Sequence, residues 1–337
     1  MSTTALLRIE DLTVVAGAAA GDPVTVVDSV NLEVGEHEVL CLVGESGSGK
    51  SVTMLAAMGL LADGLTVTHG CVRYRGTDLL TLPPGRLRAL RGKDIAMIFQ
   101  DPMTALNPVR RVGRQIQRAV RRHARVTRAA AWARAIALLD QVGVPQADRR
   151  ARAYPHQWSG GMRQRAMIAM AIANTPAVLV ADEPTTALDV TVQAQVMEVL
   201  AAARAATAAA MVMITHDLGL VAQVADRVAI MYSGRVVEQG DVLEIFERPR
   251  HPYTRALLAS LLTLDGADGP ATAIPGAPPT PRHRPPGCAF APRCTHPARS
   301  AVCSTTVPEL VGAGDGHQVA CWFPDPPASG QPPAAHP

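Results

Sequence analysis

The sequence predicts an α/β fold with a mostly parallel sheet, and three observations indicate it. Short apolar runs that suit strands buried on both faces alternate with helical stretches along most of the chain. One of these runs leads directly into a glycine-rich loop and then into a helix. Apolar residues make up 48% of the 337 residues and aromatic residues only 3%, so we expect a large core of aliphatic side chains.

The expected elements follow from local pattern. Strands are expected where apolar residues run or alternate between turn residues, helices where Ala and Arg dominate, and a hairpin where two apolar runs flank Ser-Gly. The strands are Leu6–Ile9, Thr25–Val34, Val39–Val43, Cys71–Tyr74, Ile95–Phe99, Val178–Ala181 and Met211–Ile214; the hairpin joins Arg227–Tyr232 to Arg235–Glu238; the helical stretches are Ser51–Leu61, 109–142 and Arg163–Ala173.

The glycine-rich loop is the most specific feature of the chain. Its glycines let backbone N–H groups turn toward phosphates, Lys50 can reach the β- and γ-phosphates, and the Ser51 hydroxyl can ligate Mg²⁺. Because a helix is expected to begin there, the helix N-terminus also favours an anion. The loop fits the pattern G-x-x-x-x-G-K-[ST] with Gly44, Glu45, Ser46, Gly47, Ser48, Gly49, Lys50 and Ser51.

Polar residues follow three of the later strands. Gln100 follows the run that ends at Phe99, and His216 follows the run that ends at Ile214, where it can contact a γ-phosphate. Asp182 can hold Mg²⁺ through water, and Glu183 can polarise an attacking water. Each short motif is weak by itself, but their fixed order along the chain predicts a nucleotide hydrolysis site.

Two more segments belong to the predicted nucleotide hydrolysis site. A serine hydroxyl and glycine amides open an expected helix and offer an anion site; the residues are Ser159, Gly160, Gly161, Met162, Arg163 and Gln164. Asp189 comes soon after the acidic pair, in the sequence Ala187-Leu188-Asp189.

Together these motifs resemble the ATP-binding subunit of an ABC transporter, over residues 6 to about 323. The implied fold is an ABC-type P-loop NTPase with an antiparallel β subdomain, a helical subdomain and a small Cys-containing C-terminal extension. The resemblance identifies 44–51 as Walker A, Gln100 as the Q-loop, Ser159–Gln164 as the signature, Asp182 and Glu183 as Walker B, Asp189 as part of the D-loop and His216 as the switch histidine.

The resemblance also implies a role for each of these residues. Glu183, His216 and Gln100 are implied to be catalytic, and Ser51, Gln100 and Asp182 to serve Mg²⁺. Asp182 joins the loop in binding ATP. In the signature, Ser159, Gly160, Gly161 and Gln164 are implied to contact the ATP held by a partner cassette.

Three longer segments, 100–108, 182–189 and 251–258, resemble the oligopeptide/dipeptide (and nickel) importer branch, of the D-subunit type. The implied function is ATP hydrolysis that powers import of dipeptides or oligopeptides, with nickel or another small solute as the alternative. A soluble ABC ATPase of DNA repair or translation fits less well, because neither a second cassette nor a long coiled coil is visible. A P-loop kinase would have no reason to carry the signature.

The resemblance implies several partners: a second, usually different ATP-binding subunit, two transmembrane permease subunits and an extracytoplasmic solute-binding protein. It implies a peripheral location at the cytoplasmic face of the cell (inner) membrane. The chain shows neither a signal peptide nor an apolar run of about 18 residues. The arginine series between 110 and 128 is either a solvated helix face or a surface for anionic lipid or a partner. Nucleic acid is not expected, because no aromatic residues accompany that series.

The composition changes after about residue 246. Pro and Gly crowd 269–287 and the tail after 324. We therefore expect an ABC nucleotide-binding domain over 1–245 with a helical subdomain at about 101–174, a C-terminal extension over 246–323, and a disordered tail over 324–337.

Four of the six cysteines fall in the extension, spaced C-x5-C-x8-C-x17-C: Cys288, Cys294, Cys303 and Cys321. The C-x-x-C pair of common zinc ribbons is absent. Thiolate cages suit zinc or an iron–sulfur cluster. Resemblance to peptide-importer D subunits, some of which hold a 4Fe–4S cluster here, favours that cluster; zinc and free thiols are the alternatives.

The chain departs from the family pattern at two positions. Ala16 aligns where the family stacks adenine on an aromatic residue, so we expect the stacking interaction to be missing. Trp158 stands where the signature usually opens with Leu, a residue that packs rather than touching phosphate, so the local geometry there is in question.

Overall fold

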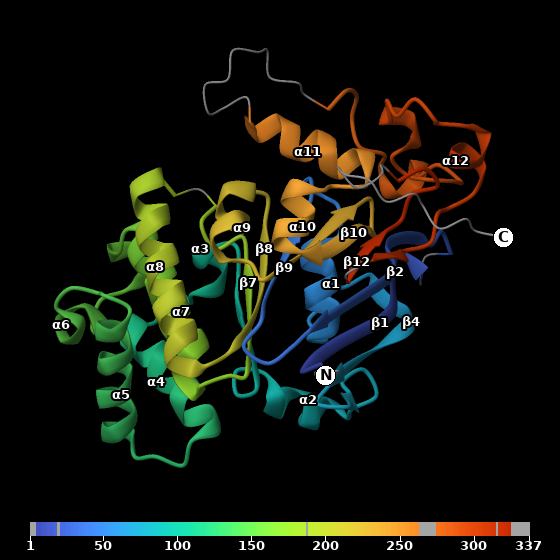
Figure 1. The fold of residues 1–337 in the computed structure, drawn as a ribbon. Coiled ribbons are helices and arrows are strands. Elements are labelled where there is room, and N and C mark those ends of the chain that lie inside the picture. The colour runs from blue at the N-terminus through green and yellow to red at the C-terminus, as the bar shows by residue number, and fades with distance from the viewer. Residues whose placement is uncertain (1–4, 19–20, 187, 263–273, 315, 325–337) are drawn as a thin grey trace. The chain divides into compact units, whose positions relative to one another are not determined.

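The computed structural model describes residues 5–18, 21–186, 188–262, 274–314 and 316–324 (Figure 1). Its contacts divide the chain into two compact units. The first unit takes the described residues of Met1–Leu7, Val34–Glu38 and Arg73–Ile214, and the second takes those of Arg8–Glu33, Val39–Val72 and Thr215–Pro337.

The first unit contains three parallel strands with β7 in the middle: β6 (Ile95–Ile98), β7 (Val178–Asp182) and β8 (Ala210–Thr215). Every residue of β7 and β8 is buried, which explains their continuous apolar sequences. A short strand, β5 (Thr77–Asp78), pairs antiparallel with Arg73 and Tyr74. Because parallel strands all end at the same edge, the residues that follow β6 and β7 meet there.

The helices of the first unit are α2 (Pro84–Leu90), α3 (Pro102–Ala105), α4 (Val112–His123), α5 (Arg128–Gln141), α6 (Ala147–Ala151), α7 (Gly160–Ala171) and α8 (Val190–Thr207). Helices α4, α5 and α7 pack against one another. The helical stretch expected over 109–142 is thus two helices. The chain leaves the helical conformation at Ala124, and the Thr127 hydroxyl accepts a hydrogen bond from Ala130 N to start α5.

The second unit holds most of an antiparallel sheet in the order β2 (Val24–Val34), β1 (Leu7–Ala16) and β4 (Leu65–Tyr74). Strand β1 continues well beyond the Leu6–Ile9 run expected from the sequence. Beside this sheet in the same unit, β3 (Val39–Val43) pairs in parallel with β9 (Arg227–Tyr232).

Strand β9 continues into β10 (Arg235–Asp241) as the expected hairpin. Ser233 and Gly234, the two turn residues, have φ of 46° and 85°, as a turn with two left-handed residues requires. We call residues 246–323 the C-terminal region. Two of its strands lie on the other side of β10, first β12 (His317–Val319) and then β11 (Val311–Gly314), both antiparallel. The C-terminal region therefore adds strands to the sheet of the second unit.

The helices of the second unit are α1 (Lys50–Ala57), α9 (Leu218–Val224), α10 (Val242–Glu247), α11 (Pro252–Leu262) and α12 (Ala301–Thr305). Helix α1 stops short of the expected Leu61 because Gly59 adopts a φ of 60°, and Leu60 N donates to Leu55 O, as in a helix C-terminal cap. Within the described part of the chain, no helix has the length and apolar character needed to cross a membrane.

Candidate functional site

The glycine-rich loop follows β3 and leads into α1, as the sequence predicts. Gly44 has a φ of 155°, and a Cβ there would lie 2.0 Å from the Met231 carbonyl oxygen, so only glycine fits. Gly47 and Gly49 also have positive φ, of 78° and 101°. The Ser48 carbonyl accepts a hydrogen bond from Gly234 N, which ties the loop to the β9–β10 turn.

Lys50 lies inside the curve of this loop and is 5% exposed. Its Nζ donates to the carbonyl oxygens of Gly44 at 2.7 Å and Glu45 at 2.9 Å, and to the Ser48 hydroxyl at 3.4 Å. Lys50 and Ser51 are the first two residues of α1, so their backbone N–H groups lie at the positive end of the helix dipole. The loop thus presents a cation and amide donors to an anion.

The acidic pair lies at the carboxyl end of β7. Asp182 is the last residue of the strand and is 5% exposed. Glu183 has a φ of 44°, which is uncommon for a residue with a side chain, and its N–H donates to Ile214 O at 2.9 Å. Such a conformation costs free energy and is often found where a side chain must be aimed.

The Glu183 carboxylate is held by two side chains. Gln100 Nε2 donates to its Oε2 at 3.0 Å, and Thr186 Oγ1 donates to the same oxygen at 2.8 Å. Gln100 and Glu183 are therefore brought together although 83 positions separate them. None of the predicted site residues is Thr186; its place three residues after Glu183 in Asp-Glu-Pro-Thr-Thr is the signal that could have found it.

The signature segment begins α7. The Ser159 side chain accepts from Met162 N at 3.4 Å and caps the helix, and Ser159 and Gly160 are exposed. A Cβ on Gly161 would lie 2.6 Å from Val192 Cγ1, so this glycine allows α7 and α8 to pack closely. Gln164 is only 2% exposed, so in this unit it is a buried residue rather than a surface one.

Trp158, Asp189 and Ala16 also have clear positions. Trp158 is 2% exposed and packs in the core of the first unit. Asp189 is exposed and caps α8 by accepting from Val192 N at 3.0 Å. Ala16 is the last residue of β1 and is half-buried, whereas Val14 before it is fully buried and offers no apolar face to a base.

The predicted site residues are divided between the two units. Gln100, Asp182, Glu183, the signature and Asp189 belong to the first unit, while the loop 44–51 and His216 belong to the second. His216 is exposed between β8 and α9. The next residue, Asp217, caps α9 by accepting from Leu220 N at 3.1 Å.

The four C-terminal cysteines are half-buried and form no disulfide. The Cys288 N–H donates to the Cys303 carbonyl at 2.8 Å. The pKa of the Cys321 thiol is raised to about 12, first by burial and also by the thiols of the other three, so all four belong to one neighbourhood. Nevertheless, within the described residues no three His, Cys, Asp or Glu side chains form a group that could hold a metal ion. The expected ligand set is therefore not assembled in this structure.

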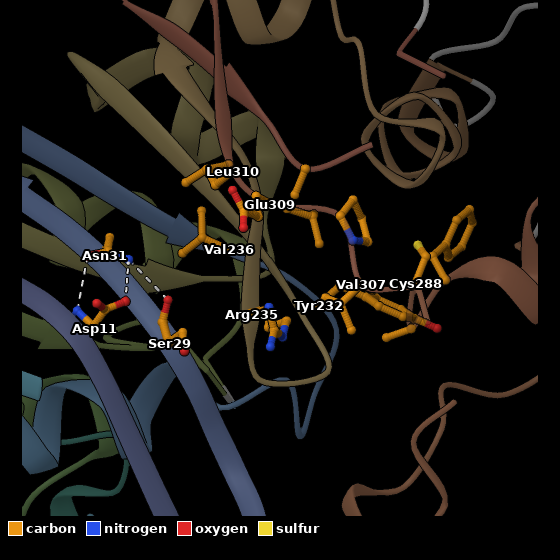
Figure 2. A pocket seen from close by; sticks show the side chains of 15 residues that line it. Asp11, Ser29, Asn31, Tyr232, Arg235, Val236, Cys288, Val307, Glu309 and Leu310 are labelled. Carbon is orange, nitrogen blue, oxygen red and sulfur yellow. Dashed lines mark hydrogen bonds between the residues drawn. The ribbon is translucent and has the colours of Figure 1, made fainter. Parts of the chain in front are cut away.

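A cavity of about 370 Å³ lies beside Cys288 in the second unit (Figure 2). Asp11, Ser29 and Asn31 from β1 and β2 line one side, and Asn31 accepts from Asp11 N at 3.0 Å. Tyr232 and residues of the C-terminal region line the other side. The cavity provides space next to one of the candidate ligands.

Seven arginines of the series between 110 and 128 line one groove of about 730 Å³ in the first unit. Arg111 lies over the Tyr154 ring at 6.0 Å, and Arg114 Nη1 donates to Gln117. The groove arginines are Arg110, Arg111, Arg114, Arg118, Arg121, Arg122 and Arg128. The series is thus concentrated on one face.

Comparisons with known proteins agree with this arrangement. The ABC transporter family model matches residues 27–186, and the model of the oligopeptide/dipeptide transporter C-terminal region matches residues 237–303. An oligopeptide transport ATP-binding protein, OppD, of Mycobacterium tuberculosis is 51% identical over 94% of this chain. The match covers 51% of that protein, so the chain spans about half the length of the mycobacterial relatives it matches.

A relative of similar length and a solved structure also match. A putative peptide import ATP-binding protein of Brucella abortus is 49% identical over 93% of this chain and 94% of its own length. The dimeric, post-hydrolysis structure of the ATP-binding cassette MJ0796 bound to ADP and Pi superposes with a TM-score of 0.63 at 25% identity, over 70% of this chain and 98% of that one. The predicted fold class and the predicted family are confirmed.

Proposed function

The chain belongs to the ABC transporter family, among the ATP-binding subunits that carry the oligopeptide/dipeptide transporter C-terminal region, and we propose that it hydrolyses ATP to power peptide import. One observation above all supports the proposal that this chain hydrolyses ATP. The carboxylate of Glu183 is aimed by an unusual backbone conformation and held by Gln100 and Thr186 at the end of a buried strand.

In this proposal, the loop 44–51 and Asp182 bind the nucleotide. Lys50 exchanges its contacts with loop carbonyls for contacts with the β- and γ-phosphates, which are stronger because both partners are charged. Ser51, Gln100 and Asp182 are the residues that would hold Mg²⁺, which neutralises phosphate charge when it is bound. Oxygen donors of this kind suit that ion.

Glu183 acts on the attacking water. Its carboxylate accepts a proton from the water while the water oxygen bonds to the γ-phosphorus and the bond from that phosphorus to the β–γ bridging oxygen breaks, which releases ADP. Gln100 and Thr186 keep the carboxylate oriented. We assign His216 to a γ-phosphate contact. Ser159, Gly160, Gly161 and Gln164 would serve the ATP of a partner cassette; the exposed start of α7 supports this for the first two, whereas the burial of Gln164 favours an indirect role.

We further propose the assembly that this function requires. The partners are a second, different ATP-binding subunit, two transmembrane permease subunits and an extracytoplasmic solute-binding protein. The chain would lie at the cytoplasmic face of the cell membrane. The family membership supports these partners, and Asp189 at the start of α8 would face the second cassette.

The proposed function is tested by reconstitution in liposomes with those partners. We expect ATP hydrolysis to rise when the binding protein carries a dipeptide or an oligopeptide, and labelled peptide to accumulate. Accumulation of nickel or another small solute without peptide uptake would reassign the substrate. ATP hydrolysis with no transport of any of these would contradict the importer assignment.

We also propose that Cys288, Cys294, Cys303 and Cys321 hold one inorganic centre, a 4Fe–4S cluster, with zinc as the alternative. Their common neighbourhood and the cavity beside Cys288 support this, and thiolates are the ligands that both centres use. Because the four thiols do not form a ligand group as they stand, binding would require them to move closer together.

A further inference from the structure

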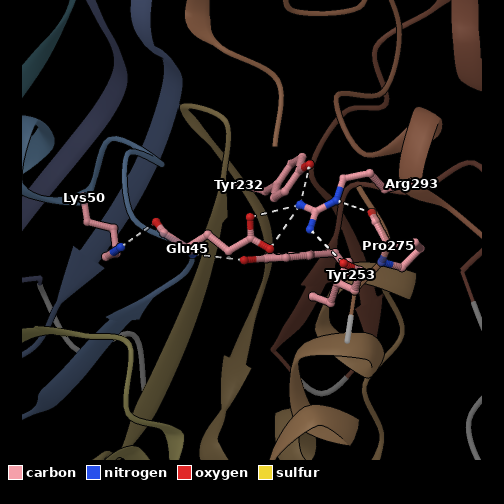
Figure 3. A network of polar contacts seen from close by, with 7 residues as sticks. Glu45, Lys50, Tyr232, Tyr253, Pro275 and Arg293 are labelled. Carbon is pink, nitrogen blue, oxygen red and sulfur yellow. Dashed lines mark hydrogen bonds and ion pairs between the residues drawn. The ribbon is translucent and has the colours of Figure 1, made fainter. Parts of the chain in front are cut away.

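Glu45, the second residue of the phosphate-binding loop, is held by residues of the C-terminal region (Figure 3). Arg293 Nη1 donates to both carboxylate oxygens of Glu45, at 3.1 Å and 2.9 Å. The Tyr253 hydroxyl accepts a hydrogen bond from Glu45 N at 3.1 Å. Both the side chain and the backbone of Glu45 are therefore fixed from outside the loop.

Arg293 is itself firmly placed. Its side chain is only 7% exposed, its Nε donates to the Pro275 carbonyl at 2.9 Å, and its Nη1 also donates to the Tyr232 hydroxyl at 3.1 Å. The guanidinium lies 5.8 Å from the centre of the Tyr232 ring. Charge-assisted hydrogen bonds to a carboxylate in a site sheltered from water are stronger than those on the surface.

Tyr253 is fully buried at the start of α11. Its ring centre lies 4.6 Å from that of Tyr232 and 5.4 Å from that of Phe290. Its N–H donates to His251 Nδ1 at 3.0 Å, and His251 N donates to Glu238 at 3.0 Å. These contacts leave the Tyr253 hydroxyl pointing at the loop with little freedom to move.

The link continues from Glu45 to the phosphate-binding lysine. The Glu45 carbonyl oxygen accepts a hydrogen bond from Lys50 Nζ at 2.9 Å. Glu45, which Arg293 and Tyr253 hold, is therefore also a hydrogen-bond partner of Lys50 in this structure. When Lys50 turns toward a phosphate, that carbonyl loses its cation. The contacts of Arg293 and Tyr253 with Glu45 do not involve Lys50 and are available to hold the residue in its place.

We propose that Arg293 and Tyr253 are positioning residues for the phosphate-binding loop, so that the nucleotide affinity of this chain depends on its C-terminal region. The proposal rests on the proposed function of the loop. Neither residue touches the nucleotide in this proposal; both act through Glu45.

The same C-terminal region offers a matched control. Arg284 Nη1 donates to Asp28 at 2.8 Å and Arg284 Nη2 to the Thr25 carbonyl, with the side chain 14% exposed. Both of these partners belong to β2, so these hydrogen bonds tie the region to β2 rather than to the loop. If Arg293 only docks the C-terminal region, then removing Arg293 and removing Arg284 should affect nucleotide binding equally.

The test compares Arg293→Ala with Arg284→Ala in the full-length chain assembled with its partners. We expect Arg293→Ala to raise the Kd and the KM for ATP roughly three- to tenfold while kcat changes less than twofold. Arg284→Ala should lower the melting temperature by about as much as Arg293→Ala does, but it should leave the Kd for ATP within twofold of that of the unmodified chain. Tyr253→Phe, which keeps the ring and removes the hydroxyl, should raise the Kd by a smaller factor. Equal effects of the two arginine variants on the Kd, or no effect of Arg293→Ala, would overturn the proposal.

Variants at Glu45, Arg293 and Lys50 separate the possible explanations. The effects of Glu45→Ala and Arg293→Ala should not be additive, because either change alone removes the contact between the two side chains. Additive effects would show that Arg293 does not act through Glu45. Lys50→Ala should abolish ATP binding in the same assay. If Lys50→Ala binds ATP normally, the proposed nucleotide site fails; if only the Arg293 variants are silent, this inference alone fails.

Discussion

At the scale of single residues, Glu183 is the most informative position. It follows a strand of apolar side chains, adopts a φ of 44° and has its carboxylate held at 3.0 Å by Gln100 and at 2.8 Å by Thr186. At a turn with no other role, glycine or asparagine would adopt this positive φ at a lower cost in conformational free energy. Glu183 adopts this conformation although it is a glutamate, as expected for a side chain whose carboxylate must be held in one direction.

Glu183→Gln should bind ATP but lose at least about a hundredfold in kcat, because an amide cannot take the proton from water. The matched control is Thr186→Ala, which removes one partner of the carboxylate and should lower kcat by a smaller factor. Turnover by the assembled complex and ATP binding are measured in parallel. Undiminished turnover in Glu183→Gln would remove this residue as the general base.

At the scale of elements, α7 begins with two neighbouring glycines, and only one of them is required by the packing around it. A Cβ on Gly160 would lie 3.5 Å from Leu188 Cδ2, an ordinary contact, whereas one on Gly161 would lie 2.6 Å from Val192 Cγ1. The branched valine side chain has little freedom to yield. Gly161 therefore serves packing of α7 on α8 whatever else it does.

Gly161→Ala should lower the free energy of unfolding by about 1–3 kcal/mol, the usual cost of overpacking. Gly160→Ala should change it by less than about 0.5 kcal/mol, since the contact is unstrained. Urea denaturation of the purified chain measures both. Equal stabilities of the two variants would show that α7 and α8 can separate without cost.

The start of α11 is another element held by one buried side chain. His251 is 1% exposed, and burial lowers its pKa to about 4, while the Glu238 carboxylate opposes that shift. Glu238 also accepts from His317 Nε2 at 2.7 Å. The neutral imidazole of His251 accepts from Tyr253 N and orients the first turn of α11.

The depressed pKa of His251 predicts how stability depends on pH. The unfolded chain binds a proton at this histidine below about pH 6.5, but the folded chain does so only below about pH 4. Stability should therefore fall as the pH is lowered from 6.5 to 4, by up to about 1.4 kcal/mol per pH unit from this group. His251→Asn keeps an acceptor for Tyr253 N and should reduce that slope in denaturation at pH 7, 6 and 5. An unchanged slope would show that His251 does not carry this pH dependence.

At the scale of the whole molecule, several kinds of contact join the C-terminal region to the rest of the second unit. Its strand β12 pairs with β10, Arg284 binds Asp28 of β2, and Arg293 binds Glu45 of the loop. The four cysteines lie within this region. Any centre they hold would therefore stabilise a part of the chain that is tied to the phosphate-binding loop.

Protein purified without oxygen should be brown and contain about four iron and four sulfide per chain if the centre is a 4Fe–4S cluster. Cys294→Ser should lose the colour and the iron, because one of four ligands is gone, while Cys71→Ser, which lies outside the set, should keep both. Stoichiometric zinc in a colourless sample would replace the cluster by zinc. A sample with neither metal would leave the four thiols free and contradict the site.

The sequence by itself determined the fold class, the family and most of the local elements. Buried parallel strands need continuous apolar runs, and a phosphate-binding loop needs glycine and lysine at set spacings, so both are readable as local patterns in Val178–Ala181 and in 44–51. The β9–β10 hairpin and the caps at Thr127, Ser159 and Asp189 follow from residue type in the same way.

Only the tertiary structure decided which distant residues meet. Gln100 and Thr186 on Glu183, and Arg293 and Tyr253 on Glu45, are contacts between side chains far apart in sequence or without a motif of their own. The burial of Gln164 and the arrangement of the four cysteines likewise depend on what packs around them. Local patterns specify backbone conformation within a few residues, whereas such contacts depend on how strands pair and helices pack, which the sequence encodes only collectively.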